Sequence, residues 1–198
     1  MGHGRAIAAL GLSVLALAGC SVGESGQAAV SDEFAITQAE VDAQVRAVLE
    51  QVGQPPGRPP GGLALATTQR LVQDALFAAK ADELGISITD AQVQQGRAAF
   101  AEQYGGEEGL VQAAGQSGIP AGALDAFVRT NLAFTAISEA LGARAGDQSV
   151  GMAALSELSE AIDVRVAPRY GTWDDAALQI VPGSTVVAPA QPAQPDAS

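Results

Sequence analysis

Residues 81–93 read Ala81-Asp82-Glu83-Leu84-Gly85-Ile86-Ser87-Ile88-Thr89-Asp90-Ala91-Gln92-Val93, and they specify the end of one helix, a short extended link and the start of another helix. Gly85 suits the position just after a helix, where the backbone turns into the left-handed conformation that glycine adopts readily. Thr89 and Gln92 form a capping box, in which each side chain accepts a bond from a free backbone N–H. The stretch therefore predicts a helix that ends near Leu84 and a second that begins after Thr89.

Helical patterns continue on both sides of this stretch. Thr37 and Glu40 form a second capping box, and the apolar residues that follow recur on one helix face. Residues 53–62 contain four prolines and cannot extend that helix, because proline lacks the amide donor. Gly96 weakens its helix by about 1 kcal/mol relative to alanine. We predict a mainly α fold with helices over Thr37–Val52, Thr67–Leu84, Thr89–Tyr104, Glu107–Ala114, Pro120–Leu141 and Met152–Ile162, and a short extended segment over Val164–Val166.

The start of the chain has the composition of a bacterial export signal. Arg5 precedes an apolar run over Ala6–Ala18 that is shorter than the roughly 20 residues of a membrane-spanning helix. The sequence Leu17-Ala18-Gly19-Cys20 matches a lipobox, which predicts cleavage before Cys20 and lipid on its thiol. We expect a signal peptide over 1–19 and a protein anchored on the extracytoplasmic face of the cell membrane. An ordinary secretory signal that happens to contain Cys20 is the alternative.

One domain is expected between two tails. Residues 20–31 are rich in Gly, Ser and Ala and predict a flexible tether. Residues 183–198 are rich in Pro and Ala and predict a disordered tail. The folded domain is then expected over 32–182.

The residue inventory excludes several kinds of chemistry. His3 is the only histidine and lies in the predicted signal, and Cys20 is the only cysteine. Without them the chain has no Ser-His-Asp or Cys-His catalysis and no histidine or cysteine metal site. Removal of Arg5 leaves nine basic residues against 22 acidic ones, a formal net charge of −13. That charge argues against nucleic acid as a partner, although solubility alone also explains it. We expect no catalytic residue, cofactor, metal or small-molecule substrate.

The order of segments over Phe34–Asp174 resembles a known family. Residues 34–42, 71–76, 81–93 and 116–120 follow one another as in the N-terminal helical domain of the SurA, PrsA and trigger-factor-like chaperones, and residues 81–93 are the most specific part. With residues 166–174, the chain also resembles SurA-like lipoproteins of actinobacteria. The resemblance implies a multi-helix chaperone domain with a short C-terminal extended segment.

One departure from the family is decisive. Many relatives carry a parvulin peptidyl-prolyl isomerase domain where this chain has only Ala143–Gly151, and parvulin sites resemble one another in using histidine. Isomerase activity is therefore not expected here.

The expected function is that of a membrane-anchored, ATP-independent holdase that binds unfolded or exported polypeptides outside the cytoplasmic membrane. An envelope adaptor with one specific partner is the alternative, and a hydrolase using paired carboxylates is a third class. The candidate client-binding residues are aromatic, and core packing is their competing interpretation: Phe77, Phe100, Tyr104, Phe127 and Phe134. Arg169, Tyr170 and Trp173 are either a partner epitope or a turn that returns the chain and docks Tyr170 and Trp173 on the helices.

Overall fold

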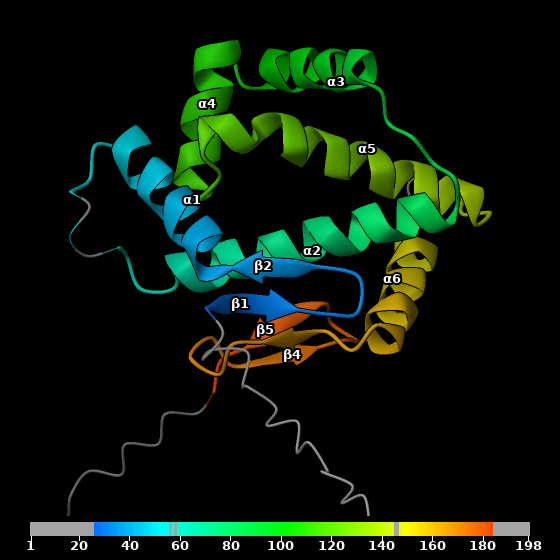
Figure 1. The fold of residues 1–198 in the computed structure, drawn as a ribbon. Coiled ribbons are helices and arrows are strands. Elements are labelled where there is room, and N and C mark those ends of the chain that lie inside the picture. The colour runs from blue at the N-terminus through cyan, green and yellow to red at the C-terminus, as the bar shows by residue number, and fades with distance from the viewer. Residues whose placement is uncertain (1–25, 56, 58, 145–146, 184–198) are drawn as a thin grey trace, which may run out of the picture.

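Helices make up most of the chain that the computed structural model describes, which comprises residues 26–55, 57, 59–144 and 147–183. The helices are α1 (Gln38–Gln51), α2 (Leu63–Glu83), α3 (Asp90–Gln103), α4 (Glu107–Gln116), α5 (Leu124–Ala140) and α6 (Ser149–Ala161), with a 3-10 turn, η1 (Ala121–Ala123), before α5. The strands are β1 (Gln27–Val30), β2 (Ala35–Thr37), β3 (Arg165–Val166), β4 (Thr172–Asp174) and β5 (Gln179–Val181). The prediction of a mainly helical protein is confirmed (Figure 1).

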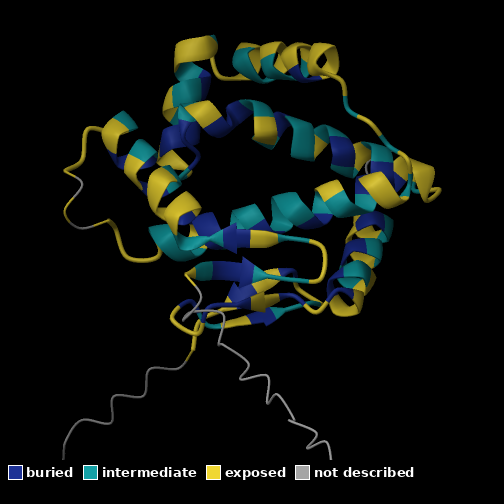
Figure 2. Ribbon diagram, viewed as in Figure 1, coloured by how far each residue is buried: buried dark blue, intermediate teal, exposed yellow. Residues whose placement is uncertain are grey.

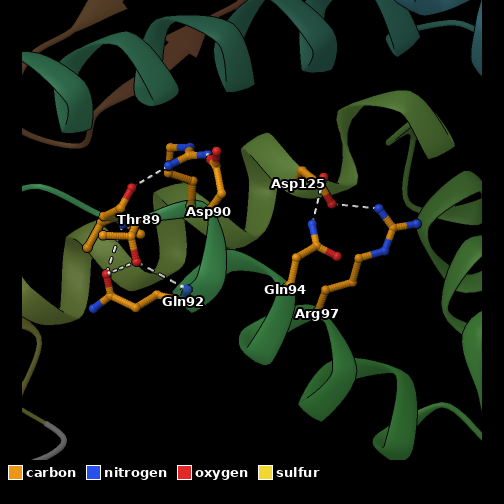
Figure 3. Close-up of polar contacts among 8 residues, drawn as sticks. Thr89, Asp90, Gln92, Gln94, Arg97 and Asp125 are labelled. Carbon is orange, nitrogen blue, oxygen red and sulfur yellow. Dashed lines mark hydrogen bonds and ion pairs between the residues drawn. The ribbon is translucent and has the colours of Figure 1, made fainter.

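The link between α2 and α3 has the predicted geometry. Gly85 has a positive φ of 67°, and the Ile86 amide donates to the Ala81 carbonyl at 2.8 Å, as in a Schellman helix ending. At the start of α3, the Thr89 amide donates to Gln92 Oε1 at 2.8 Å, and the Gln92 amide donates to Thr89 Oγ1 at 3.3 Å (Figure 3). The capping box of Thr37 and Glu40 is likewise present at α1.

Two helices begin earlier than the apolar pattern indicates. Helix α2 begins at Leu63 rather than Thr67, directly after Gly62 with its φ of 89°. Helix α6 begins at Ser149 rather than Met152, where Asp147 Oδ1 accepts bonds from both the amide and the hydroxyl of Ser149. In both cases a local turn, and not the apolar stripe, sets the first residue.

The predicted flexible tether is wrong for its last residues. Strand β1 lies at the centre of an antiparallel sheet with the order β2-β1-β3, and Ala28 and Ala29 within it are fully buried. Their small side chains resemble a linker in composition, but small size is also what a strand needs to lie close under helices. The predicted signal peptide, Cys20 and residues 21–25 lie outside the described residues, as does the predicted tail from 184 onward.

The C-terminal strands return the chain to the helices. Strands β4 and β5 pair antiparallel, with Trp173 opposite Ile180. Trp173 is buried and its indole Nε1 donates to Ser159 Oγ on α6 at 2.8 Å, while the buried Tyr170 hydroxyl donates to Gln38 Oε1 on α1 at 2.8 Å. A surface epitope made by Tyr170 and Trp173 is therefore wrong, because both aromatic side chains are part of the core, and only Arg169 of the three candidates is exposed.

The described core forms three clusters, of which the smallest joins Ala81 on α2 to Ala133 and Ile137 on α5. We call the largest the sheet-side core; it joins α1, α2, α6 and the strands and includes Val41, Val72, Leu76, Leu155 and Trp173. A smaller cluster under α3 and α4 contains Leu110, Ala114, Ile119, Ala123 and Leu124, and we call this end the α3–α4 layer. Figure 2 shows α3 with mainly exposed and intermediate residues, and Val93 is its one buried residue among those described.

Candidate functional site

The five aromatic candidates lie in two separate places. Phe77 on α2 and Phe134 on α5 meet edge to face with ring centroids 5.2 Å apart. Phe100 on α3 and Phe127 on α5 form a second pair at 5.9 Å, beside the α3–α4 layer. All four rings are half-buried against core residues, whereas Tyr104 is 51% exposed. The five therefore do not line one common groove: Phe100, Tyr104 and Phe127 lie around one hollow, while Phe77 and Phe134 line others.

Two larger hollows, both lined by described residues, lie around Val52, at the end of α1. One, of about 600 Å³, opens between the end of α1, the start of α2 and the end of α4, and its described lining is Val48, Leu49, Val52, Gln54, Pro60, Gly61, Gly62, Leu63, Ala66 and 115–118. A second, of about 500 Å³, is lined by Gln51, Val52, Glu107, Glu108, Val111, Gln112 and Gln116. Both include Val52 and Gln116, so we describe them together as the Val52 groove. Val52 itself is 39% exposed.

Gln51 holds two walls of the groove together. Its Nε2 donates to the Val111 carbonyl on α4 at 2.6 Å, and its Oε1 accepts from the Ala121 amide at 2.7 Å. Gly115 makes this contact possible, since a Cβ there would lie 2.6 Å from Gln51 Nε2. Three segments that are distant in the sequence are thus fixed around one side chain.

The two halves of the groove differ in charge. In the 600 Å³ half, the described lining consists of aliphatic side chains, glycine backbone, proline and neutral polar groups. The other half has Glu107 and Glu108 at its margin, and Glu107 accepts bonds from Arg97 on α3. The neutral half can cover apolar side chains of a ligand at about 25 cal/mol per Å² of buried surface, while the acidic margin favours neutral or basic neighbours in the ligand.

Titratable groups elsewhere have structural partners. Asp74 on α2 accepts from Thr130 Oγ1 on α5 at 2.9 Å and pairs with Arg70 at 2.9 Å, and Arg70 also donates to Gln44 on α1. Burial raises the pKa of Asp74, although the bonds from Thr130 and Arg70 oppose the increase. This network joins α1, α2 and α5.

Neighbouring carboxylates in the sequence, such as Glu107 with Glu108 and Asp174 with Asp175, do not assemble into a larger acidic cluster. Within the described ranges, no three His, Cys, Asp or Glu residues lie close enough to hold a metal ion together. Asp175 accepts from Ser159, and Asp174 accepts from the Ala177 amide. Both bonds stabilise the C-terminal hairpin and its contact with α6.

No protein-family model, curated protein or solved structure matches the chain. In the described part of the chain, no helix is both long and apolar enough to cross a membrane. The function proposed below therefore rests on the Val52 groove and on the sequence resemblance.

The sequence predicts Val52 only as part of the apolar face of the first helix, and residues 53–62 only as a loop. One signal in the sequence could have pointed to them. The apolar stripe of α1 continues to Val52, while the chain after Val52 enters a Gly- and Pro-rich loop that offers few side chains to cover it. An apolar helix face that extends beyond the residues able to pack against it indicates a surface available to a ligand.

Proposed function

We propose that this protein is a membrane-anchored, ATP-independent holdase for unfolded or exported polypeptides outside the cytoplasmic membrane. The observation that carries the proposal is the Val52 groove, whose larger half is neutral and mainly apolar in its described lining. Such a surface recognises exposed aliphatic side chains in an extended chain and has little basis for selecting a particular sequence. The resemblance of residues 81–93 to SurA-type domains supports the same function.

The size of the groove favours weak and reversible binding. Its hollows of about 600 and 500 Å³ suit a short segment of a client, not a folded protein. An unfolded client also loses conformational entropy on binding, which offsets much of the gain from apolar burial. Weak binding allows a holdase to release its client without ATP.

A specific envelope adaptor is the second candidate. The bonds of Gln51 to Val111 and Ala121 favour it, because they fix the groove walls before any ligand arrives. A preformed site costs less to organise and so permits tighter binding of one partner. The number of unrelated proteins that bind distinguishes the two functions.

The proposal includes a lipid anchor and excludes isomerase activity. The anchor is the lipid on Cys20 that the lipobox predicts, which would hold the domain near chains emerging from the membrane. The absence of isomerase activity follows from the short segment Ala143–Gly151 in the place of a parvulin domain and from the lack of any histidine after His3.

Ala66→Glu provides the sharpest test of the groove. Ala66 is exposed in the first turns of α2, where an acidic residue suits the helix N-terminus, so the variant should fold normally. Its carboxylate would lie in the neutral half of the groove, and we expect suppression of client aggregation without ATP to require about tenfold more protein. The matched control is Ala99→Glu, at an exposed position on α3 outside the groove.

The assay should use several unrelated unfolded clients. Equal losses across clients for Ala66→Glu, with no loss for Ala99→Glu, support a holdase. If the wild-type protein protects none of them at several-fold excess but binds one envelope protein stoichiometrically, the adaptor is the better account. Equal activity of all three proteins would place client binding outside the Val52 groove.

A further inference from the structure

Strand β5 is held along α2 by two glutamine side chains. Gln73 Nε2 donates to the Leu178 carbonyl at 2.8 Å, and Gln69 Oε1 accepts from the Ile180 amide at 3.0 Å. As the chain advances from Leu178 to Ile180, its partner moves back along α2 from Gln73 to Gln69. The C-terminal strand therefore runs toward the first turn of α2 (Figure 1).

The same face of α2 leads into the Val52 groove. Ala66, Gln69 and Gln73 have the spacing i, i+3 and i+7, which places them on one side of a helix. Measured along the helix axis, Ala66 lies about 4.5 Å from Gln69 toward the start of α2. One or two residues of extended chain cover that distance. Ala66 also lines the neutral half of the groove. Gly183, the last residue described, follows Ile180 by three positions, so the chain beyond it starts at the end of the molecule where α2 begins (Figure 1).

The sequence that follows has the chemistry of a ligand for this half of the groove. Residues 184–190 read Ser184-Thr185-Val186-Val187-Ala188-Pro189-Ala190 and contain no charge. Two adjacent valines supply apolar side chains, and Pro189 favours an extended backbone without an amide to satisfy. The segment 184–198 spans up to about 50 Å when extended, so its length does not restrict access to the groove.

We propose that the segment 184–190 docks in the neutral half of the Val52 groove of its own chain and competes there with clients. Docking of this segment would regulate client binding, and in that respect it rests on the proposed function. The segment is tethered close to the groove, so its effective concentration is on the order of millimolar. A sequence this short and neutral then occupies the groove part of the time and yields to a better client.

Photo-crosslinking of the full chain tests the docking without reference to any client. A photoreactive side chain at Ala66 should form intramolecular crosslinks to peptides within 184–198, and one at Ala99 should not. The double variant Val186→Asp/Val187→Asp should lose the crosslinks from Ala66. Ala193→Asp/Ala197→Asp, which adds the same charge further along, should keep them. Absence of crosslinks from Ala66 to 184–198, or crosslinks only between molecules, would overturn the docking.

Client protection by the same variants separates this inference from the proposed function. We expect Val186→Asp/Val187→Asp to suppress aggregation about two- to tenfold more effectively than the wild type, since a competitor at millimolar effective concentration is removed. Unchanged protection together with absent crosslinks refutes the docking and leaves the holdase intact. Crosslinks from Ala66 without protection of any client support the docking and refute the holdase.

Discussion

The sheet-side core and the α3–α4 layer are stabilised in different ways. The sheet-side core contains seventeen buried residues drawn from both ends of the described chain, from Ala28 to Ile180. The α3–α4 layer contains five, all between Leu110 and Leu124. Arg97 on α3 pairs with Glu107 on α4 and with Asp125 on α5, and Figure 3 shows the contact with Asp125. The layer thus combines a small apolar cluster with ion pairs between its helices, whereas the sheet-side core has a much larger set of buried apolar residues.

This difference assigns separate roles to the two ends of the molecule. The sheet-side core includes residues from both the first and the last described strands, so its stability is a property of the whole domain. The α3–α4 layer can loosen while that core stays intact, because local opening needs only the free energy of its own few contacts. The Val52 groove lies at the boundary, with walls from α1 and α2 on one side and α4 on the other.

The largest effect is expected from Trp173→Ala. Trp173 is buried in the sheet-side core and bonds to Ser159 on α6, so its truncation leaves a cavity and removes a tie between β4 and α6. We expect a loss of about 3 to 5 kcal/mol in the free energy of unfolding and a Tm lower by about 6 to 20 °C. Chemical and thermal denaturation followed by circular dichroism measure both.

The control for Trp173→Ala is Tyr104→Ala at the end of α3. Tyr104 is 51% exposed, and its truncation should cost about 1 kcal/mol or less. Similar losses for both variants would show that the two ends of the molecule contribute equally to stability and would remove the contrast between them.

A smaller and more local effect is expected from Gly96→Leu. A Cβ at Gly96 would lie 2.8 Å from Val128 Cγ1 on α5, and Val128 is buried and cannot move away easily. Overpacking of this kind costs about 1 to 3 kcal/mol, of which the better helix propensity of leucine recovers up to about 1. Hydrogen exchange should show lost protection in α3 and α4 and unchanged protection in α2.

Ala99→Leu, at an exposed position on the same helix, controls for the added side chain and should leave protection unchanged. Lost protection in α2 after Gly96→Leu would mean that the α3–α4 layer does not open separately from the sheet-side core.

The sequence predicted features that depend on neighbouring residues. Capping boxes at Thr37 and Thr89 and the left-handed Gly85 are formed by residues within four positions of each other, so their chemistry is visible in a short stretch. The sequence predicts only that Gly96 weakens its helix, whereas the close contact that favours glycine there is made by Val128, 32 positions away on α5.

Features that depend on distant contacts were not predictable in this way. Strand β1 has the composition of a linker and becomes a strand because β2 and β3 lie beside it. The Val52 groove arises where α1, α2 and α4 meet, and no local pattern places Gly115 next to Gln51. The aromatic candidates are predicted from residue type alone, and the fold places four of the five in two separate pairs, with Tyr104 51% exposed beside the second.

The smallest expected effect is on the pH dependence of stability. It distinguishes the contacts of Arg97 with Asp125 from those of Asp74 with Arg70 and Thr130. A hydrogen bond from Arg97 is the main cause that holds the pKa of Asp125 below its ordinary value, with further help from the charge of Arg97 and from Gln94. A lowered carboxyl pKa stabilises the folded state above the unfolded value of about 3.9 and loses that effect as the pH falls through the folded value. Burial raises the pKa of Asp74, so its contribution has the opposite sign: it favours folding at low pH and is lost as the pH rises through the folded value.

Asp125→Asn and Asp74→Asn should therefore respond to pH in opposite directions. We expect the wild type to have a higher Tm than Asp125→Asn at pH 6, by a few degrees at most, and the difference to shrink as the pH falls through the lowered pKa of Asp125. Relative to Asp74→Asn, the wild type should gain stability as the pH falls from 6 to 3. Thermal denaturation of the three proteins across this range, at low salt to preserve the exposed ion pairs, gives both differences. A pH-independent gap between the wild type and Asp125→Asn would show that the Arg97 contacts do not control the stability of the α3–α4 layer.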